Sequence, residues 1–502
     1  MKFLKIFLSS VFILSGEQSI SQVTFQKTYG GTERDQAMFI NHTNDGGYIL
    51  TGWTNSFGAG GFDVYLLKLD SIGNLEWTKT FGGIDNEVGN YVMQTSDNGF
   101  IVGGSTQSFG TGLNVGYLIK TDSLGNLLWS KALIGTTPIN SLVEVSDGYF
   151  IAFNGGIIKI NSSGNYVYNK SGIPSQYLNN TSDNGFILTG NLTPAVNLTK
   201  TDSSMNVLWS KNYSFNFTSV SATFVKESAE GGFLITGDSY NSGMFFIKTD
   251  SIGNLIWNKR ITMTQPNKGY SVKSTIDGGY IISGRIYNGW SDLLVLIKLD
   301  NNGDLLWHKR FGSFGGDEWG YSMLETGDGG YIMAGFTFGF GLGLDDIFLV
   351  KSDSSGISGC NEDIPNVTIN TNSTTVTTYN PLIASPTIAF TNPPTVVGSG
   401  GNTTTSCFGG LVTSMSEISL ENFNIYPNPA YDKIFLEFES KVDSNFLLNL
   451  KDITGRIIKS ERFRIHKGPN EFTFEISEID KGAFFLDFFN NDRKFVKKVI
   501  IN

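Results

Sequence analysis

The chain has 502 residues, a formal net charge of −10, two cysteines and three histidines. An acidic chain argues against nucleic acid and anionic membranes as partners, because both carry negative charge themselves. Two cysteines and scattered histidines do not supply the four closely spaced ligands of a structural zinc site. The composition leaves cations and neutral ligands, such as glycans, as candidate partners.

Residues 1–21 have the composition of a secretory signal peptide. Lys2 and Lys5 precede the apolar stretch from 6 to 14, and small residues follow at Ser19-Ile20-Ser21. This order of charged, apolar and small residues predicts cleavage before Gln22. The apolar stretch is too short to span a bilayer, and no later stretch approaches the roughly 20 apolar residues that a membrane span needs. We therefore expect an exported protein without a transmembrane segment.

Two short markers recur seven times between residues 23 and 356. The first is an acidic residue followed by glycine and an aromatic residue, and it starts at Asp45, Asp97, Asp147, Asp183, Glu230, Asp277 and Asp328. The second is a lysine two positions before Asp or Asn, and it starts at Lys68, Lys120, Lys159, Lys200, Lys248, Lys298 and Lys351. Recurrence at this period indicates a repeat architecture of seven units.

Each unit has the pattern of four short strands. β-Branched and aromatic residues alternate between clusters of Gly, Asn, Asp and Ser, which is the signal of strands and tight turns. A four-stranded sheet of roughly 45 residues cannot bury its own faces, whereas seven packed radially can. The pattern predicts an all-β domain at 22–356, a seven-bladed β-propeller.

The N-terminal strand is predicted to close this propeller. The seventh unit ends near Gly356 without a fourth strand, and Phe25 aligns with the tryptophan that opens this strand elsewhere, such as Trp77. Lys27 aligns with Lys79 in the same way. Completion of the last blade by the N-terminal strand also removes two exposed sheet edges.

The stretch from Lys68 to Trp77, with the order Lys-Leu-Asp-Ser-Ile-Gly-Asn-Leu-Glu-Trp, resembles the blade motif of pyrroloquinoline-quinone-type propellers and their non-enzymatic relatives. The region 23–356 is similar to propeller repeats of secreted proteins of the Bacteroidota. This resemblance implies a fold and carries no chemistry by itself. The adjacent cysteines and calcium ligands of the quinone dehydrogenases are not found in this sequence.

Residues 357–420 are rich in Thr, Asn, Ser and Pro and are predicted to form a linker. Cys360 and Cys407 both lie in this segment. In an exported chain a disulfide between them is favoured over a metal site, with two free thiols as the alternative.

Residues 421–502 have alternating strands that suggest a small Ig-like β-sandwich. Four motifs occur in order and resemble the type A C-terminal sorting domain of type IX secretion cargo. Their residues are Tyr426, Pro427, Asn428 and Pro429; Gly455 and Arg456; Lys481 and Gly482; and Lys497 and Lys498 in the closing strand. The resemblance implies export through the periplasm by the type IX machinery, removal of the domain, and attachment to surface lipopolysaccharide. The alternative is an ordinary terminal sandwich.

The sequence contains no visible catalytic machinery. His42, His308 and His466 share no motif, and no Gly-x-Ser-x-Gly elbow is present. Carboxylates drawn from distant blades, as in propeller glycosidases, stay open as an alternative.

A ligand site is predicted where the loops are longest, in blades 7, 1 and 2. Phe57, Phe109, Trp319 and Phe338 are the expected stacking platforms, and Asp63, Asp345 and Asp346 the expected polar or Ca²⁺-binding groups. The competing interpretation treats these residues as structural positions of the repeat. The prediction for the whole protein is a non-catalytic module that binds glycan or protein at the cell surface or outside the cell. The alternatives are a glycan-degrading enzyme and a structural component of the cell envelope.

Overall fold

The computed structural model describes most of the chain from residue 22 onward. The described residues are 22–215, 219–239, 243–262, 267–287, 291–313, 316–364, 367–371, 373–385, 388–408, 421–440, 444–451, 457–477, 479, 481–490 and 493–501. The predicted signal peptide lies outside them. Within these ranges every regular element is a β-strand, and the strands of each sheet pair antiparallel.

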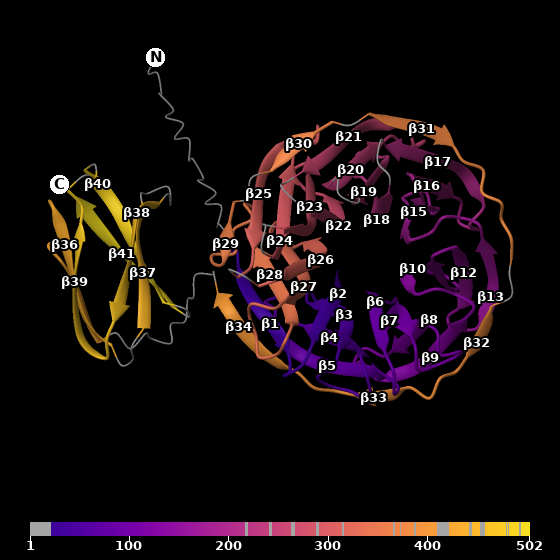
Figure 1. The fold of residues 1–502 in the computed structure, drawn as a ribbon, viewed down its shortest axis with the longest axis horizontal. Coiled ribbons are helices and arrows are strands. Elements are labelled where there is room, and N and C mark those ends of the chain that lie inside the picture. Colours follow the sequence, from indigo (N-terminus) through magenta and orange to yellow (C-terminus); the bar gives the residue numbers. More distant parts are fainter. Residues whose placement is uncertain are drawn as a thin grey trace, which may run out of the picture.

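Seven sheets of successive strands are arranged in a ring, which we call the ring domain (Figure 1). Sheet 1 contains β2 (Asp35–His42), β3 (Tyr48–Thr54), β4 (Asp63–Leu69) and β5 (Leu75–Gly82). Sheet 2 contains β6 (Glu87–Gln94), β7 (Phe100–Thr106), β8 (Val115–Thr121) and β9 (Leu127–Ile134). Sheet 3 contains β10 (Ile139–Val145), β11 (Gly148–Phe153), β12 (Gly156–Asn161) and β13 (Tyr166–Ser171). Sheet 4 contains β14 (Tyr177–Asn180), β15 (Phe186–Leu192), β16 (Ala195–Thr201) and β17 (Val207–Phe215).

The remaining sheets continue the same order. Sheet 5 contains β18 (Val220–Glu227), β19 (Phe233–Ser239), β20 (Gly243–Thr249) and β21 (Leu255–Thr262). Sheet 6 contains β22 (Asn267–Ser274), β23 (Tyr280–Tyr287), β24 (Asp292–Leu299) and β25 (Leu305–Phe311). Sheet 7 contains β26 (Glu318–Glu325), β27 (Tyr331–Thr337) and β28 (Asp346–Ser352), and its fourth strand is β1 (Phe25–Gly30) from the other end of the domain. The first strand of each sheet lies innermost, and sheets 7 and 1 are neighbours.

The contact between neighbouring sheets is the same across the seam as elsewhere. The indole of Trp77 packs under Gly125 in the turn of sheet 2, where an added Cβ would lie 2.7 Å from the indole and where φ is +76°. Phe25 packs under Gly73 of sheet 1 in the same way, with φ of +74°. Glycine is needed at both turns because other residues rarely adopt this φ and have no room there. Phe25 therefore joins sheet 7 to sheet 1 as Trp77 joins sheet 1 to sheet 2.

The two sequence markers meet as an ion pair in every sheet. The lysine of the second marker is buried at the start of the hairpin, and its ammonium group contacts the acidic residue of the first marker. The seven pairs are Lys68–Asp45, Lys120–Asp97, Lys159–Asp147, Lys200–Asp183, Lys248–Glu230, Lys298–Asp277 and Lys351–Asp328. The markers recur because each pair closes the end of one sheet.

The segment expected to serve as a linker instead follows the outer rim of the ring domain up to residue 408. Six short strands of this segment each add a fifth strand to one sheet, in the order of sheets 6, 5, 4, 2, 1 and 7. They are β29 (Glu362–Asp363), β30 (Thr368–Asn370), β31 (Thr374–Thr378), β32 (Ala389–Thr391), β33 (Val396–Gly398) and β34 (Asn402–Phe408). At sheet 3 a single bridge joins Ala384 to Ser171.

We call residues 357–408 the belt, because they encircle the ring domain against the direction of its sheets (the orange outline in Figure 1). Residues 409–420 lie outside the described ranges. The outermost strand of each sheet offers unpaired N–H and C=O groups, and Thr-rich segments have a high β-propensity. The belt covers these edges, which explains why a segment of linker-like composition forms strands.

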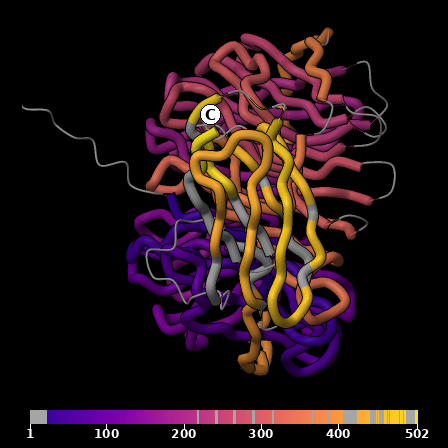
Figure 2. Tube along the Cα trace, turned by 90° about the vertical axis from the view of Figure 1, so that its left-hand side faces the viewer, coloured from indigo at the N-terminus to yellow at the C-terminus, as the bar shows by residue number. Residues whose placement is uncertain are grey.

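The C-terminal domain consists of two further sheets. One contains β35 (Glu421–Tyr426), β36 (Lys433–Ser440) and β39 (Gly468–Glu475), and the other contains β37 (Ser444–Lys451), β38 (Ile457–Ile465), β40 (Gly482–Asn490) and β41 (Arg493–Ile501). Figure 2 looks onto these strands, which lie side by side. Leu436 and Phe474 of the first sheet and Leu448 and Leu486 of the second share one buried cluster. Two sheets that face each other across an apolar core form a sandwich.

Candidate functional site

The acidic residues of the predicted ligand sector are buried at the starts of strands. Asp63 opens β4 and Asp346 opens β28, and each side chain is 1% exposed. Asp63 Oδ2 accepts a hydrogen bond from the Ala59 N–H at 2.8 Å, and Asp346 Oδ2 accepts from the Leu342 N–H at 2.7 Å. Asp345, also 1% exposed, accepts from the Gln36 side chain. These carboxylates hold loops of their own ring domain in place.

Burial changes the acidity of these carboxyl groups. Burial, with a smaller contribution from the nearby Glu87 carboxylate, raises the pKa of Asp63 to about 6. Burial also raises the pKa of Asp346, with added repulsion from Asp35 and Asp345. Asp63 Oδ1 has no hydrogen-bond partner among the described residues, and a Cβ at Gly82 would lie 1.8 Å from it. Gly82 therefore lies close against this oxygen, where a residue with a Cβ atom would clash.

No group of three acidic, histidine or cysteine side chains in the described ranges is arranged to hold a metal ion. Ca²⁺ binds six to eight oxygen atoms. The carboxylates of Asp63 and Asp346 instead accept hydrogen bonds from backbone N–H groups. The described residues therefore do not fit a Ca²⁺ site in this sector.

The aromatic residues of the sector differ in exposure. Phe109 is 9% exposed and packs 5.7 Å from the Tyr117 ring centroid, and Phe57 packs against Tyr65. The Trp319 ring lies 3.8 Å beneath the guanidinium of Arg285. Phe338 is 46% exposed. The loops lie on neighbouring sheets as expected, but Phe338 is the most open of the four predicted platforms.

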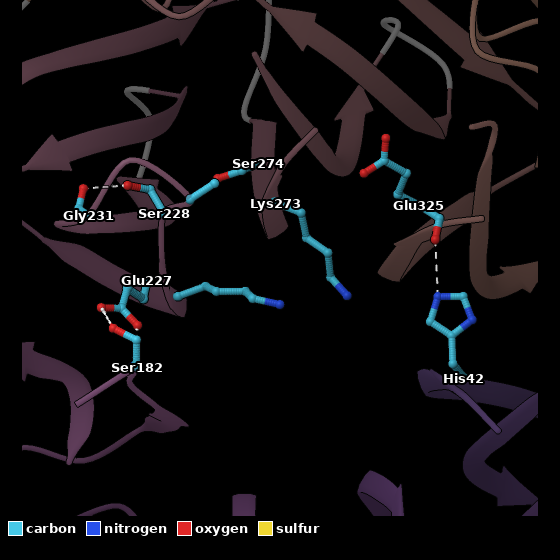
Figure 3. A pocket seen from close by; sticks show the side chains of 10 residues that line it. His42, Ser182, Glu227, Ser228, Gly231, Lys273, Ser274 and Glu325 are labelled. Atoms are coloured by element: carbon cyan, nitrogen blue, oxygen red, sulfur yellow. Dashed lines mark hydrogen bonds between the residues drawn. The ribbon is translucent and has the colours of Figure 1, made fainter. Parts of the chain in front are cut away.

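A pocket of about 590 Å³ lies elsewhere, at the ends of the innermost strands (Figure 3). Its lining comes from sheets 1, 4, 5, 6 and 7, which meet only around the axis of the ring domain. The lining residues are His42, Ser182, Lys226, Glu227, Ser228, Ala229, Gly231, Lys273, Ser274 and Glu325. This volume is in the range of small-ligand sites.

The carboxylates of the pocket are used by neighbouring hairpins. Glu227 accepts hydrogen bonds from the Ser182 N–H and from the Ser182 hydroxyl at 2.9 Å. Glu325 Oε1 accepts from the Ile276 N–H at 3.3 Å, and His42 Nε2 donates to the Glu325 carbonyl at 3.0 Å. Burial lowers the pKa of His42, helped by repulsion from Lys273. With His42 neutral and the carboxylates accepting these hydrogen bonds, the two lysines are the charged groups of the lining that have no direct partner among the described residues.

Lys226 and Lys273 have no hydrogen-bond or ion-pair partner among the residues that the structure describes. In Figure 3 the Lys273 side chain reaches toward the middle of the pocket. Burial lowers the pKa of Lys273 to about 7, and repulsion from Lys226 acts in the same direction while Glu325 opposes it. Burial also lowers the pKa of Lys226, whose side chain is exposed to the solvent of the pocket although protein surrounds it.

Sequence reasoning missed these two lysines. A comparison of the repeats would have found them, because the register aligns them with one position in every sheet. In each innermost strand, one residue pairs with the aromatic residue of the first marker, and the position in question comes just before it. It holds Asn41, Met93, Val143, Asn179, Lys226, Lys273 and Leu324. Adjacent sheets 5 and 6 carry lysine where the other five carry an uncharged residue.

In the C-terminal domain, three of the four predicted motifs meet at one end. Asn428 Oδ1 accepts a hydrogen bond from the Ile500 N–H at 2.9 Å, and the Ala430 N–H donates to the Ile500 carbonyl at 2.8 Å. Gly482 pairs with Ile501 across the last two strands. Gly455 and Arg456 lie outside the described residues, and of Lys497 and Lys498 the structure describes the backbone in β41.

The comparisons with known proteins agree with these motifs. Residues 424–502 match the family model described as the secretion system C-terminal sorting domain. No curated protein matches the chain. Among solved structures, Sqt1 from Chaetomium thermophilum is similar to 62% of this chain and 82% of its own, at 10% identity and a TM-score of 0.35. A likeness at this TM-score carries no argument about the ring domain.

No helix among the described residues is long and apolar enough to cross a membrane. The matched C-terminal domain implies recognition by the type IX secretion machinery and export out of the cell. Residues 424–502 are therefore a C-terminal sorting domain of the type IX secretion system.

Proposed function

We propose that this protein is a type IX secretion cargo whose ring domain, a seven-bladed β-propeller closed by β1, is a non-catalytic module for binding glycan or protein. The exported chain begins at Gln22 in this proposal. Gln22 Oε1 accepts a hydrogen bond from the Ser354 N–H at 3.0 Å, which ties the new N-terminus to sheet 7. After export the protein acts at the cell surface, on a lipopolysaccharide anchor, or free outside the cell.

The observation that carries the proposal is the pocket on the axis of the ring domain. Five sheets contribute to it, and its lysines are free while its carboxylates accept hydrogen bonds from neighbouring hairpins. A general acid or base has to reach a substrate proton. Glu227 and Glu325 are held by hairpin N–H groups, which supports binding without turnover.

A carbohydrate screen of the whole chain from residue 22 tests this function. Soluble polysaccharides are passed over the immobilised protein, and both retention and released reducing sugar are measured. Retention without release is the expected result. Release of sugar would establish the glycan-degrading alternative. The structural alternative would be established if neither retention nor release is detected and a pull-down recovers a protein of the cell envelope.

The sector of sheets 7, 1 and 2 stays a second prediction for the binding surface. Its test uses Phe338→Ala on the exposed platform, because Asp63 and Asp346 support their loops and their replacement would disturb the fold. The ligand would lie in the sector if Phe338→Ala lowers the retention of polysaccharide while variants of the axial pocket retain as much as the wild type.

A further inference from the structure

The two lysines of the axial pocket depart from the repeat in a specific way. In each innermost strand, the residue just before the one that pairs with the marker aromatic occupies an equivalent place. At this place Asn41 and Asn179 use their amide groups to approach the carbonyls of the next sheet, at 3.4 Å. Lys226 and Lys273 have no such partner in the described ranges. The repeat therefore does not need lysine here for its structure.

Two adjacent ammonium groups without partners are unfavourable in a fold. Burial favours the neutral form of an amine, and like charges repel each other, so both effects oppose protonation in this pocket. The acidic side chains that could neutralise the lysines turn away, because Glu227 holds Ser182 and Glu325 holds the Ile276 N–H. The lining contains two lysines and two glutamates, so what distinguishes the pocket is the lack of direct pairing between these charges among the described residues. The attraction of a bound anion would offset both the repulsion and the cost of desolvation.

The pocket lining also contains a buried hydroxyl group, which a ligand reaches when the Ser274 side chain rotates toward the cavity. Ser274 Oγ, next to Lys273, is buried and has no hydrogen-bond partner among the described residues. A buried hydroxyl without a partner costs free energy, and a polar ligand that reaches it would recover that cost. An ammonium pair beside a hydroxyl matches an oxyanion on a hydroxylated carrier, which a sugar acid or a sulfated sugar provides.

We propose that Lys226, Lys273 and Ser274 form a binding site for the carboxylate or sulfate group of an acidic saccharide. This inference rests on the proposed binding function and names its ligand class. The two ammonium groups bind the oxyanion, and Ser274 binds a neighbouring oxygen of the saccharide. A pocket of about 590 Å³ accommodates a short oligosaccharide rather than an ion alone.

The affinity of this site for an anion depends on pH near neutrality, whereas that of a surface with ordinary lysines does not. Lys273, with a pKa of about 7, faces Lys226, Glu325, Glu227 and His42. Above pH 7 it is mostly neutral, and below pH 7 it is charged, so affinity for an anion rises as the pH falls from 8.5 to 6. Loss of one charge-assisted hydrogen bond of about 1.4 kcal/mol corresponds to a tenfold change in affinity.

The experiment measures the affinity of the whole chain from residue 22 by calorimetry at pH 6 and pH 8.5. The probes are an oligogalacturonate, a heparin-derived oligosaccharide, a neutral cello-oligosaccharide of equal length, and inorganic sulfate. The variants are Lys226→Gln, Lys273→Gln and their double variant. Lys131→Gln on the outer strand β9 is the matched control, and Asn179→Lys adds a third cation at the same repeat position in sheet 4.

We expect one acidic saccharide to bind about tenfold more tightly at pH 6 than at pH 8.5, and about tenfold more weakly in each single Lys→Gln variant. Lys273→Gln also removes the pH dependence, Lys131→Gln changes nothing, and Asn179→Lys raises affinity. Tighter binding of the galacturonate identifies a carboxylate ligand, and tighter binding of the heparin fragment a sulfate ligand.

Unchanged acidic-saccharide affinity in the double variant would overturn the site and leave the binding function standing. Equal affinity for the neutral oligosaccharide would do the same. Binding of inorganic sulfate without any saccharide would overturn the saccharide ligand. If neither any saccharide nor sulfate binds, the site is overturned. If no carbohydrate or protein ligand is retained in the separate screen, the binding function is overturned as well.

Discussion

The belt is predicted to depend on a disulfide that joins its two ends. Cys360 is disulfide-bonded, and Cys407 is the other cysteine of the chain. Both lie beside Gln26 of β1, whose side chain donates to the Cys360 carbonyl and whose backbone pairs with Cys407. A bond between them closes the belt into a covalent hoop around all seven sheets. The perturbation is Cys360→Ser together with Cys407→Ser, or reduction of the wild type.

The magnitude follows from the length of the closed loop. The segment from residue 360 to residue 407 forms a loop of roughly 50 residues, and closing it in the unfolded chain is worth about 4 kcal/mol. We expect the double variant to lose most of this free energy of unfolding. The belt strands keep their pairing in the folded variant, so the change acts mainly on the unfolded state.

The assay is urea unfolding of the chain from residue 22, followed by tryptophan fluorescence. All eight tryptophans lie between Trp53 and Trp319, so the signal reports the ring domain and not the sorting domain. Reductant should lower the midpoint of the wild type and leave the double variant unchanged, which is the internal control. A loss below about 1 kcal/mol would refute the hoop as a stabilising device, and two free thiols in the denatured, unreduced protein would refute the pairing itself.

Three further changes test the ring domain. Replacement of Phe25 by Ala should lower the free energy of unfolding by about 3–5 kcal/mol, because it removes the side chain that joins sheet 7 to sheet 1. A loss of only about 0.5 kcal/mol, which is typical of a surface substitution, would contradict this. The Lys200 ammonium lowers the pKa of Asp183 to about 2, so this ion pair stabilises the fold above the unfolded pKa near 4 and is lost as the pH falls toward 2. Asp183→Asn should therefore cost about 0.5–1 kcal/mol at pH 7, since Asp183 is largely exposed, and nothing at pH 2, as read from urea midpoints at both values. Burial lowers the pKa of Lys273 to about 7 in the fold, against 10.5 in the unfolded chain, so protonation of Lys273 destabilises the fold. This cost is complete below pH 7 and disappears above pH 10.5. Lys273→Met should therefore raise the melting temperature at pH 6 and lose this gain as the pH approaches 10.5.

The sequence predicted the elements whose partners are nearby in the chain. The acidic residue of each first marker and the lysine of each second marker lie in the same sheet, so the recurrence of the two markers indicated the repeats. The N-terminal strand was predicted at long range because Phe25 and Lys27 copy Trp77 and Lys79, and copied residues make copied contacts. Comparison with the repeat was enough in both cases, since residues that match the repeat make the contacts of the repeat.

The belt and the axial pocket could not be predicted in this way, because their partners belong to other units. The belt strands have two to seven residues and acquire their structure from the open edges of six different sheets. The burial of Asp63 and Asp346 could not be predicted for a related reason, since both residues follow loops that fold back over them. Lys226 and Lys273 carry a signal only when all seven innermost strands are compared in register. The inferred ligand site therefore rests on a charge that breaks the structural repeat in two neighbouring units and has no partner among the described residues.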